Sequence, residues 1–201
     1  MKTIAIVNPH AGNGRTEKLW PNIELALKQS IGTFQTEHTS CKGDATILTR
    51  KALEGGATRV IAIGGDGHLN EVINGFIEND VSLYPDAILS FVMSGTGCDF
   101  QRSLGVSSKW ETAVAKLKDA PIRQIDVGKV SYTAPDKTTQ IRYFDNIASF
   151  GLSGAADHYI DNSSLGKYFG GTVLYLWATI KTVFTHPNQT IRYRIDDGQQ
   201  E

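Results

Sequence analysis

Three short glycine-rich segments stand out in the first half of the chain, and each follows a run of apolar, largely β-branched residues. They are residues 8–15 (NPHAGNGR), 64–67 (GGDG) and 94–97 (SGTG). The preceding runs have the length and composition of buried strands, and helical patterns follow the turns. This repetition of strand, glycine turn and helix predicts an α/β domain built on a doubly wound, mostly parallel sheet.

The same patterns give the boundaries of the elements. We expect strands at residues 3–7, 34–39, 59–63 and 87–93, and helices at 16–29, 44–53 and 69–77, with further helical segments up to residue 117. Beyond residues 120–121 the pattern changes to longer, antiparallel strands at 123–133 and 139–149 around a polar turn at 135–137, then a helix at 168–185 and a strand at 190–195. The chain therefore divides into an α/β domain over residues 1–120 and the first part of a β-rich domain over residues 121–201.

Charge and composition exclude several classes of protein. Lys and Arg number 20 against 21 Asp and Glu, for a net charge of −1, so the chain has no strong positive field to hold nucleic acid. Cys41 and Cys98 form no metal or redox motif, and the N-terminal apolar stretch is too short for an export signal. The apolar stretch at residues 169–184 is interrupted by polar residues and is shorter than a bilayer span. We expect a cytoplasmic protein whose membrane contact is peripheral.

The glycine turns indicate a phosphate site. In open α/β sheets ligands bind at the carboxyl ends of the strands, so the three turns should converge. Glycine lets backbone N–H groups approach a phosphate, and a following helix N-terminus adds a favourable dipole. A single such turn is more often a tight connection, but three at one sheet edge favour a nucleotide. The sequence holds neither a Walker A motif nor a dinucleotide-type G-x-G-x-x-G after the first strand.

Together these segments resemble the diacylglycerol kinase catalytic domain. The resemblance is carried by NPHAG at residues 8–12 with Gly14 and Arg15, by GGDG at 64–67 continuing through NEVING at 70–75, and by Gly95-Thr96 with Asp99, Phe100 and Arg102. It continues through IDVG at 125–128 and NIASFG at 146–151, and so covers essentially the whole chain. That family includes bacterial diacylglycerol and lipid kinases, and is more distantly similar to NAD kinases and phosphofructokinases.

The resemblance implies ATP and Mg²⁺ as cofactors. It implies a nucleotide site made by Asn8, Gly12, Gly14, Arg15, Thr39, Gly64, Gly65, Asp66, Gly67, Glu71, Gly95 and Thr96. Asp66 would act on Mg²⁺ directly or through water, because a carboxylate among phosphates needs a bridging cation. Asp66, Asp99 and Asp126 are the implied catalytic acids. Simpler roles stay open: caps or turn residues for these three, a place in the first turn of its helix for Glu71, and a solvated side chain for Arg15.

Two residues and the chain's length depart from the family pattern. His68 stands where many relatives have threonine, and Cys98 stands where the common residue is asparagine, whose amide makes stronger hydrogen bonds than a thiol. Relatives continue through a complete β-sandwich that carries the general base. The segment Asp197-Gly198-Gln199 instead reads as a turn, so we expect an incomplete sandwich here and the general base beyond Glu201.

The implied reaction is transfer of the ATP γ-phosphoryl group to a lipid hydroxyl, with diacylglycerol or a related lipid alcohol as acceptor. The apolar helix at 168–184 could line an acceptor site or simply be a core helix. NAD or small-metabolite kinases of the same superfamily, and an inactive nucleotide-binding fragment, remain alternatives. Unpaired sandwich edges favour pairing with a second copy, so a homodimer also stays open.

Overall fold

A computed structural model of the chain describes residues 1–95, 97–149, 151–161, 171–185 and 187. The chain forms two compact units, Met1–Ala148 and Ser149–Glu201, each described here by itself. The first contains β1 (Thr3–Val7), α1 (Ala11–Ile31), β2 (Gln35–His38), α2 (Asp44–Glu54), β3 (Arg59–Gly64), α3 (Asp66–Phe76), β4 (Ile77–Glu78), β5 (Val81–Ser82), β6 (Ile88–Met93), α4 (Asp99–Ser103), α5 (Trp110–Lys116), β7 (Gly128–Thr133) and β8 (Thr139–Phe144). The second contains α6 (Leu152–Asp161) and α7 (Gly171–Thr185).

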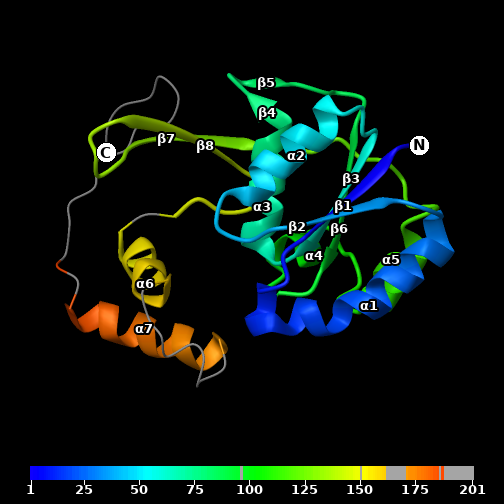
Figure 1. Ribbon diagram of the computed structural model, residues 1–201. Helices are drawn as coiled ribbons and strands as arrows, with labels where there is room; N and C mark the ends of the chain where they lie inside the picture. The colour runs from blue at the N-terminus through cyan, green and yellow to red at the C-terminus, as the bar shows by residue number, and fades with distance from the viewer. Residues whose placement is uncertain (96, 150, 162–170, 186, 188–201) are drawn as a thin grey trace. The chain divides into compact units, whose positions relative to one another are not determined.

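The central sheet is parallel, with the strand order β2-β1-β3-β6 (Figure 1). The chain leaves β1 toward β2 on one side, and then returns to add β3 and β6 on the other side. The strand order therefore reverses between β1 and β3, which is where open α/β sheets bind their ligands. The predicted doubly wound, parallel α/β fold is confirmed.

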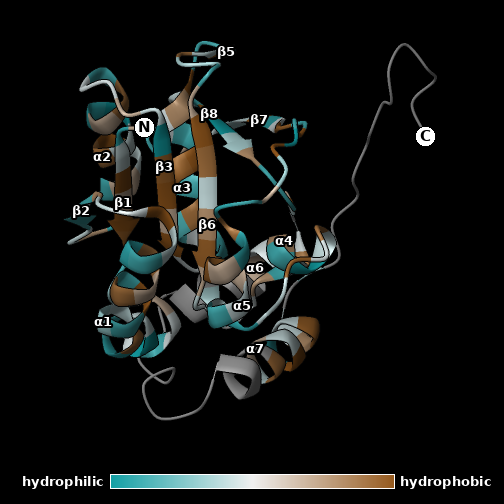
Figure 2. Cartoon of the chain, turned by 90° about the vertical axis from the view of Figure 1, so that its right-hand side faces the viewer, coloured by the Kyte–Doolittle hydropathy of each residue, from teal (hydrophilic) through white to brown (hydrophobic). Residues whose placement is uncertain are grey.

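Alternation along the strands gives the sheet two buried faces. Residues Ile4 and Ile6 of β1 pack with α2, α3 and α4, whereas Ala5 and Val7 pack with α1 and α5. Figure 2 shows β1, β3 and β6 as hydrophobic ribbons between more polar helices. Strands buried on both faces need apolar residues at every position, which is why these runs were recognisable in the sequence.

The predicted strands and helices agree with the structure in this region, with small shifts at their ends. The strand predicted at 3–7 coincides with β1, and the helix predicted at 44–53 is one residue shorter than α2. The helix predicted at 69–77 begins earlier, at Asp66, so Glu71 lies in its second turn rather than its first. A small hairpin, β4 and β5, was missed. Its two-residue turn, Asn79-Asp80, has positive φ at both positions, as a type I′ turn requires.

The antiparallel hairpin after residue 121 is shorter than predicted. Strands β7 and β8 pair only from Gly128↔Phe144 to Thr133↔Thr139, and residues 121–127 and 145–149 form no strand. A strand extends only as far as a partner pairs with it, and no described strand pairs with residues 121–127, where Ile122 and Ile125 are exposed. The boundary near residue 120 and the β-sandwich stay predictions. The strand predicted at 190–195 and the turn at 197–199 lie outside the described residues.

The second unit is a pair of helices in its described part. Helix α7 agrees with the predicted helix at 168–185, whereas α6 was not predicted. The rings of Tyr159 and Trp177 lie 5.7 Å apart between the helices, and Lys181 Nζ lies 4.2 Å from the Tyr159 ring centroid. Among the described helices, none has both the length and the apolarity that crossing a bilayer requires.

Candidate functional site

The three glycine turns converge at the carboxyl edge of the central sheet, as predicted. A β-carbon added to Gly12 would lie 2.8 Å from Ser94 O, which brings the first turn against the third. A β-carbon on Gly95 would lie 2.6 Å from Gly65 Cα, which brings the third turn against the second. Real side chains do not approach so closely, so glycine is required at Gly12 and Gly95 for the turns to meet.

The first turn winds left-handed before helix α1 becomes regular. Gly12, Asn13 and Gly14 have φ values of 60°, 57° and 80°. Asn8 starts the turn: its backbone N donates to Ile63 O at 2.9 Å, and its Oδ1 accepts a hydrogen bond from His10 N at 3.0 Å. The first bond connects the turn to β3. The second lies within the turn and engages Asn8 Oδ1 with the backbone of His10.

Buried hydroxyl groups form hydrogen bonds next to the glycine turns. Thr16 Oγ1 and Ser94 Oγ share a hydrogen bond of 2.6 Å, and Ser94 N donates to Gly64 O at 2.7 Å. The predicted site residue Thr39 is likewise buried, and its backbone N donates to Val7 O at 2.9 Å. Thr16 and Ser94 were missed in the sequence as site residues. Thr16 begins a predicted helix and Ser94 begins the third glycine turn, and neither position signalled this buried pair.

The second turn opens directly into helix α3. Gly65 is the N-cap residue, and no side chain caps the helix. The first-turn N–H groups at Asp66, Gly67 and His68 have no acceptor within the helix and can serve an anion. Gly64 is buried, and a β-carbon there would lie 2.7 Å from the His68 ring, so a glycine is required at this position too.

Glu71, a predicted nucleotide-site residue, contacts the start of helix α2 through its carboxylate. Its Oε1 accepts a hydrogen bond from Gly43 N at 2.9 Å, and its backbone O accepts one from Thr46 Oγ1 at 2.8 Å. Gly43 is the N-cap of α2. In the structure Glu71 thus caps a neighbouring helix, a role that the sequence did not suggest.

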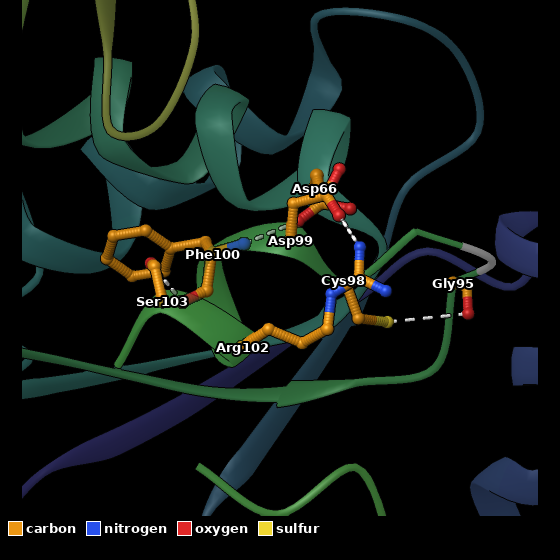
Figure 3. A network of polar contacts seen from close by, with 7 residues as sticks. All are labelled: Asp66, Gly95, Cys98, Asp99, Phe100, Arg102 and Ser103. Carbon is orange, nitrogen blue, oxygen red and sulfur yellow. Dashed lines mark hydrogen bonds and ion pairs between the residues drawn. The ribbon is translucent and has the colours of Figure 1, made fainter. Parts of the chain in front are cut away.

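Two carboxylates flank Gly97 beyond the third turn. A β-carbon on Gly97 would lie 3.0 Å from Asp66 Oδ2 and 3.5 Å from Asp99 Oδ2, so the carboxylates of these two predicted acids both lie against Gly97. Figure 3 shows Asp66 and Asp99 next to each other. Asp66 Oδ1 accepts a hydrogen bond from Phe100 N at 3.3 Å, and Asp99 is paired with Arg102.

A third carboxylate, that of Asp145, was missed in the sequence. Burial raises the pKa of Asp145, and the nearby negative charge of Asp66 raises it further, while a hydrogen bond from Asn70 opposes the shift. Asp145 directly follows β8 and precedes Asn146, where the quoted motif begins. No signal for this placement was available in the sequence, because the predicted strand continues through this position to residue 149.

Three of the predicted site residues are not among the contacts described above: Asp126, Arg15 and Thr96. Asp126 is exposed on the segment before β7, and its side chain makes no hydrogen bond or ion pair with a described residue. Arg15 is exposed but close enough to lower the pKa of Cys98 by its charge, although burial dominates and raises that pKa overall. Thr96 lies outside the described residues.

Cys98 occupies a position that suits asparagine. It has φ 54° and ψ 43°, a left-handed conformation, and precedes α4 without capping it by a side-chain hydrogen bond. Its Sγ lies 3.4 Å from Gly95 O, a weak contact that Figure 3 shows as a link back to the third turn. Asparagine tolerates this conformation better than most residues, which agrees with its expected presence in relatives.

The residues fit a Mg²⁺ ion only in combination with a phosphate. Among the described residues, no group of three or more His, Cys, Asp or Glu side chains is placed to hold a metal alone. Mg²⁺ in phosphoryl-transfer sites is commonly bound by one or two carboxylates together with phosphate oxygens and water. Asp66 and Asp99, whose carboxylates both lie against Gly97, supply such a pair of carboxylates.

A doubly wound α/β domain whose glycine turns meet at the switch point is of the class that binds phosphorylated ligands. The chain belongs to the family of the diacylglycerol kinase catalytic domain, which it matches over residues 2–130.

Similar proteins carry related names. The diacylglycerol kinase of Staphylococcus haemolyticus is 32% identical over 147 residues, which are 73% of this chain and 40% of that protein. The diacylglycerol kinase of Staphylococcus carnosus is 31% identical over 198 residues, 96% of this chain and 58% of that protein. A crystal structure of a diacylglycerol kinase from Bacillus anthracis matches with a TM-score of 0.61 and 26% identity, covering 83% of this chain and 52% of that one. The chain spans about half the length of the curated relatives that it matches.

Proposed function

We propose that this chain is the nucleotide-binding part of an ATP-dependent lipid kinase, which phosphorylates a lipid hydroxyl such as that of diacylglycerol. The observation that carries the proposal is the meeting of three glycine turns beside the carboxylates of Asp66 and Asp99. Family membership supports the reaction class, and the names of the similar proteins favour a lipid as acceptor.

The residues have separate roles in this proposal. The turns at Gly12, Gly65 and Gly95 bring backbone N–H groups to the ATP phosphates, and the dipole of α3 favours their negative charge. Asp66 and Asp99 hold Mg²⁺ against the phosphates directly or through water. Mg²⁺, when bound, neutralises charge that develops on the transferred group.

In the transfer step the lipid hydroxyl oxygen attacks the γ-phosphorus, the bond from that phosphorus to the bridging oxygen breaks, and ADP leaves. The hydroxyl proton passes to a carboxylate acting as general base. The resemblance assigns this base to the β-sandwich of the relatives, and Asp126 is a further proposed acid of the site. A lipid acceptor also implies that the protein works at a membrane surface, in peripheral contact from the cytoplasm.

The test is a phosphorylation assay with labelled ATP and Mg²⁺, using vesicles that contain diacylglycerol and other lipid alcohols, beside NAD and sugars as competing acceptors. A longer version of the chain, extended with the remaining strands of a relative, is assayed in parallel. We expect labelled lipid from the extended chain. Labelled NAD or sugar would replace the lipid assignment, and the absence of ATP binding by both chains would overturn the proposal.

A further inference from the structure

Helix α3 carries a stripe of three polar residues at a spacing of four: Asp66, Asn70 and Asn74. Residues four apart lie on the same side of a helix, so the stripe leads from the site carboxylate of Asp66 along one face of α3. Strand β8 lies against this face, and both asparagines bond to its residue Tyr143.

Asn74 pairs with the backbone of Tyr143 as a neighbouring strand would. Its Nδ2 donates to Tyr143 O at 2.9 Å, and its Oδ1 accepts a hydrogen bond from Tyr143 N at 3.0 Å. The second hydrogen of Asn74 Nδ2 goes to Asn70 O at 2.8 Å. The side chain of Asn74 thus pairs with backbone N–H and C=O groups on the edge of β8 that faces away from β7. This pairing fixes the position of β8 along α3.

Asn70 extends the pairing toward the site. Its Nδ2 donates to Tyr143 O at 2.8 Å and to Asp145 Oδ1 at 3.5 Å. Tyr143 O therefore accepts from both asparagines. Asp145, which follows β8 by one position, thereby contacts Asn70, which lies one helical turn from Asp66 on the same face of α3. We call Asn70, Asn74 and Tyr143 the asparagine clasp.

The side-chain hydroxyl of Tyr143 makes a separate set of hydrogen bonds, which we call its second anchor. Its hydroxyl donates to Asp80 Oδ1 at 2.8 Å and accepts a hydrogen bond from Asp80 N at 2.8 Å, and Lys129 Nζ lies 2.6 Å from Asp80 Oδ2. This second anchor stabilises the hairpin but does not touch the amides of Asn70 and Asn74. The two anchors of one residue can therefore be separated by mutation.

We propose that Asn70 and Asn74 are positioning residues, whose clasp on the backbone of Tyr143 places the carboxylate of Asp145 beside Asp66. Because a negative charge near Asp66 attracts a cation, loosening the clasp should weaken the effect of Mg²⁺ on ATP binding. This consequence rests on the proposed function, whereas the clasp itself does not.

The first measurement is hydrogen exchange at the Tyr143 amide in the 201-residue chain. Asn74→Ala removes both bonds to the Tyr143 backbone, and should speed exchange at that amide by about tenfold, as expected for the loss of one hydrogen bond. Asn74→Leu, which keeps the shape of the side chain but neither bond, serves where Asn74→Ala does not fold. Asn74→Asp retains an oxygen that accepts from Tyr143 N and should keep exchange slow, so it is the matched control. Unchanged exchange in Asn74→Ala and Asn74→Leu overturns the clasp, whatever the protein binds.

The second measurement is the gain in ATP affinity on adding Mg²⁺, determined by calorimetry. We expect Asn74→Ala and Asp145→Asn each to lose part of this gain, and the double variant to lose no more than Asp145→Asn alone. Tyr143→Phe is the matched control, because it breaks the anchor to Asp80 and should lower the melting temperature while leaving the Mg²⁺ gain intact.

Additive losses, or an equal loss in Tyr143→Phe, would overturn the link from the clasp to Asp145 and reduce the asparagines to a structural role. A wild-type chain with no affinity for ATP in Mg²⁺ would instead overturn the proposed function. In that case the hydrogen-exchange rate at the Tyr143 amide would still test whether the clasp exists, independently of nucleotide binding.

Discussion

Gly65 and Gly95 touch backbone to backbone, since a β-carbon on Gly95 would lie only 2.6 Å from Gly65 Cα. The two residues belong to turns that follow neighbouring strands, β3 and β6. Neither turn can move away without leaving its strand, so the contact fixes the distance between the second and third turns of the candidate site.

Gly95→Ala should therefore separate these turns. Overpacking of this kind costs about 1–3 kcal/mol of unfolding free energy, and displaced N–H groups should lower ATP affinity about tenfold or more. Gly67→Ala is a control for stability, because a β-carbon there would meet nothing within 4 Å and alanine favours the helix. Urea unfolding and calorimetry measure both quantities. Equal stability of the two variants would contradict the close contact.

Asp66→Asn should weaken ATP binding in the presence of Mg²⁺ by about 10- to 100-fold, in the range typical of residues that support a metal site. Without Mg²⁺ the same variant should bind ATP at least as well as wild type, because a negative charge near the phosphates is removed. Asparagine keeps an oxygen that can accept from Phe100 N, so the fold should be unaffected.

The control for this pair of titrations is Asp86→Asn, a substitution of the same type at an exposed aspartate that precedes β6, whereas the third turn follows the other end of that strand. It should leave ATP affinity unchanged with and without Mg²⁺. Equal Mg²⁺-dependent affinities for wild type and Asp66→Asn would remove Asp66 from the metal site.

Cys98→Asn should stabilise the third turn. Cys98 has a left-handed backbone that asparagine adopts more readily, and the relief is worth about 1 kcal/mol. An amide there should also strengthen nucleotide binding by about 0.5–1.5 kcal/mol, the contribution of one hydrogen bond. Cys98→Ala, which removes the thiol without favouring this conformation, should show neither gain. A loss of affinity in Cys98→Asn would mean that the thiol is adapted to its site.

The strands of the central sheet could be predicted because their information is local. Residues 4–7 and 60–63 are apolar at every position, which only a strand covered on both faces needs, and the turns after these strands are marked by glycine. The convergence of the turns followed from a general property of parallel sheets, and the structure confirms it. Nothing in that inference required contacts between particular side chains.

The parts that could not be predicted depend on partners distant in the sequence. Asn74 bonds to Tyr143 across 69 positions, and Glu71 caps a helix whose N-cap residue lies 28 positions before it. Strands β7 and β8 end where their mutual pairing ends, which no local pattern reveals. Asp145 becomes a neighbour of Asp66 only because β8 lies along α3. Such residues look ordinary until the fold brings them together.

The hydroxyl pair of Thr16 and Ser94 should be coupled energetically. Thr16→Val leaves a buried Ser94 hydroxyl short of a partner and should cost about 1–3 kcal/mol of unfolding free energy. Ser94→Ala should cost a similar amount, and the double variant should cost less than the sum of the two. Denaturant unfolding of all four proteins measures the coupling. Strictly additive losses would show that the two hydroxyls do not depend on each other.

His68 should make stability depend on pH. Its ring is buried, which disfavours the charged form, and its Nε2 donates to Ile6 O at 2.9 Å. Burial lowers the pKa of His68 below its ordinary value of 6.5, against smaller opposing effects of the Ile6 hydrogen bond and the Glu71 charge. Above pH 6.5 both the folded and the unfolded chain carry a neutral His68, and stability does not depend on this group.

As the pH falls below 6.5, the unfolded chain takes up a proton at His68 before the folded chain does. The unfolding free energy should therefore fall by at most about 1.4 kcal/mol per pH unit from this residue, until the lower folded pKa is reached. Urea unfolding between pH 5 and 8 measures the slope in wild type, in His68→Gln and in His10→Gln, an exposed histidine that serves as the control. We expect His68→Gln to lose this part of the slope and His10→Gln to keep it. The same slope in all three proteins would show that His68 does not titrate differently in the folded chain.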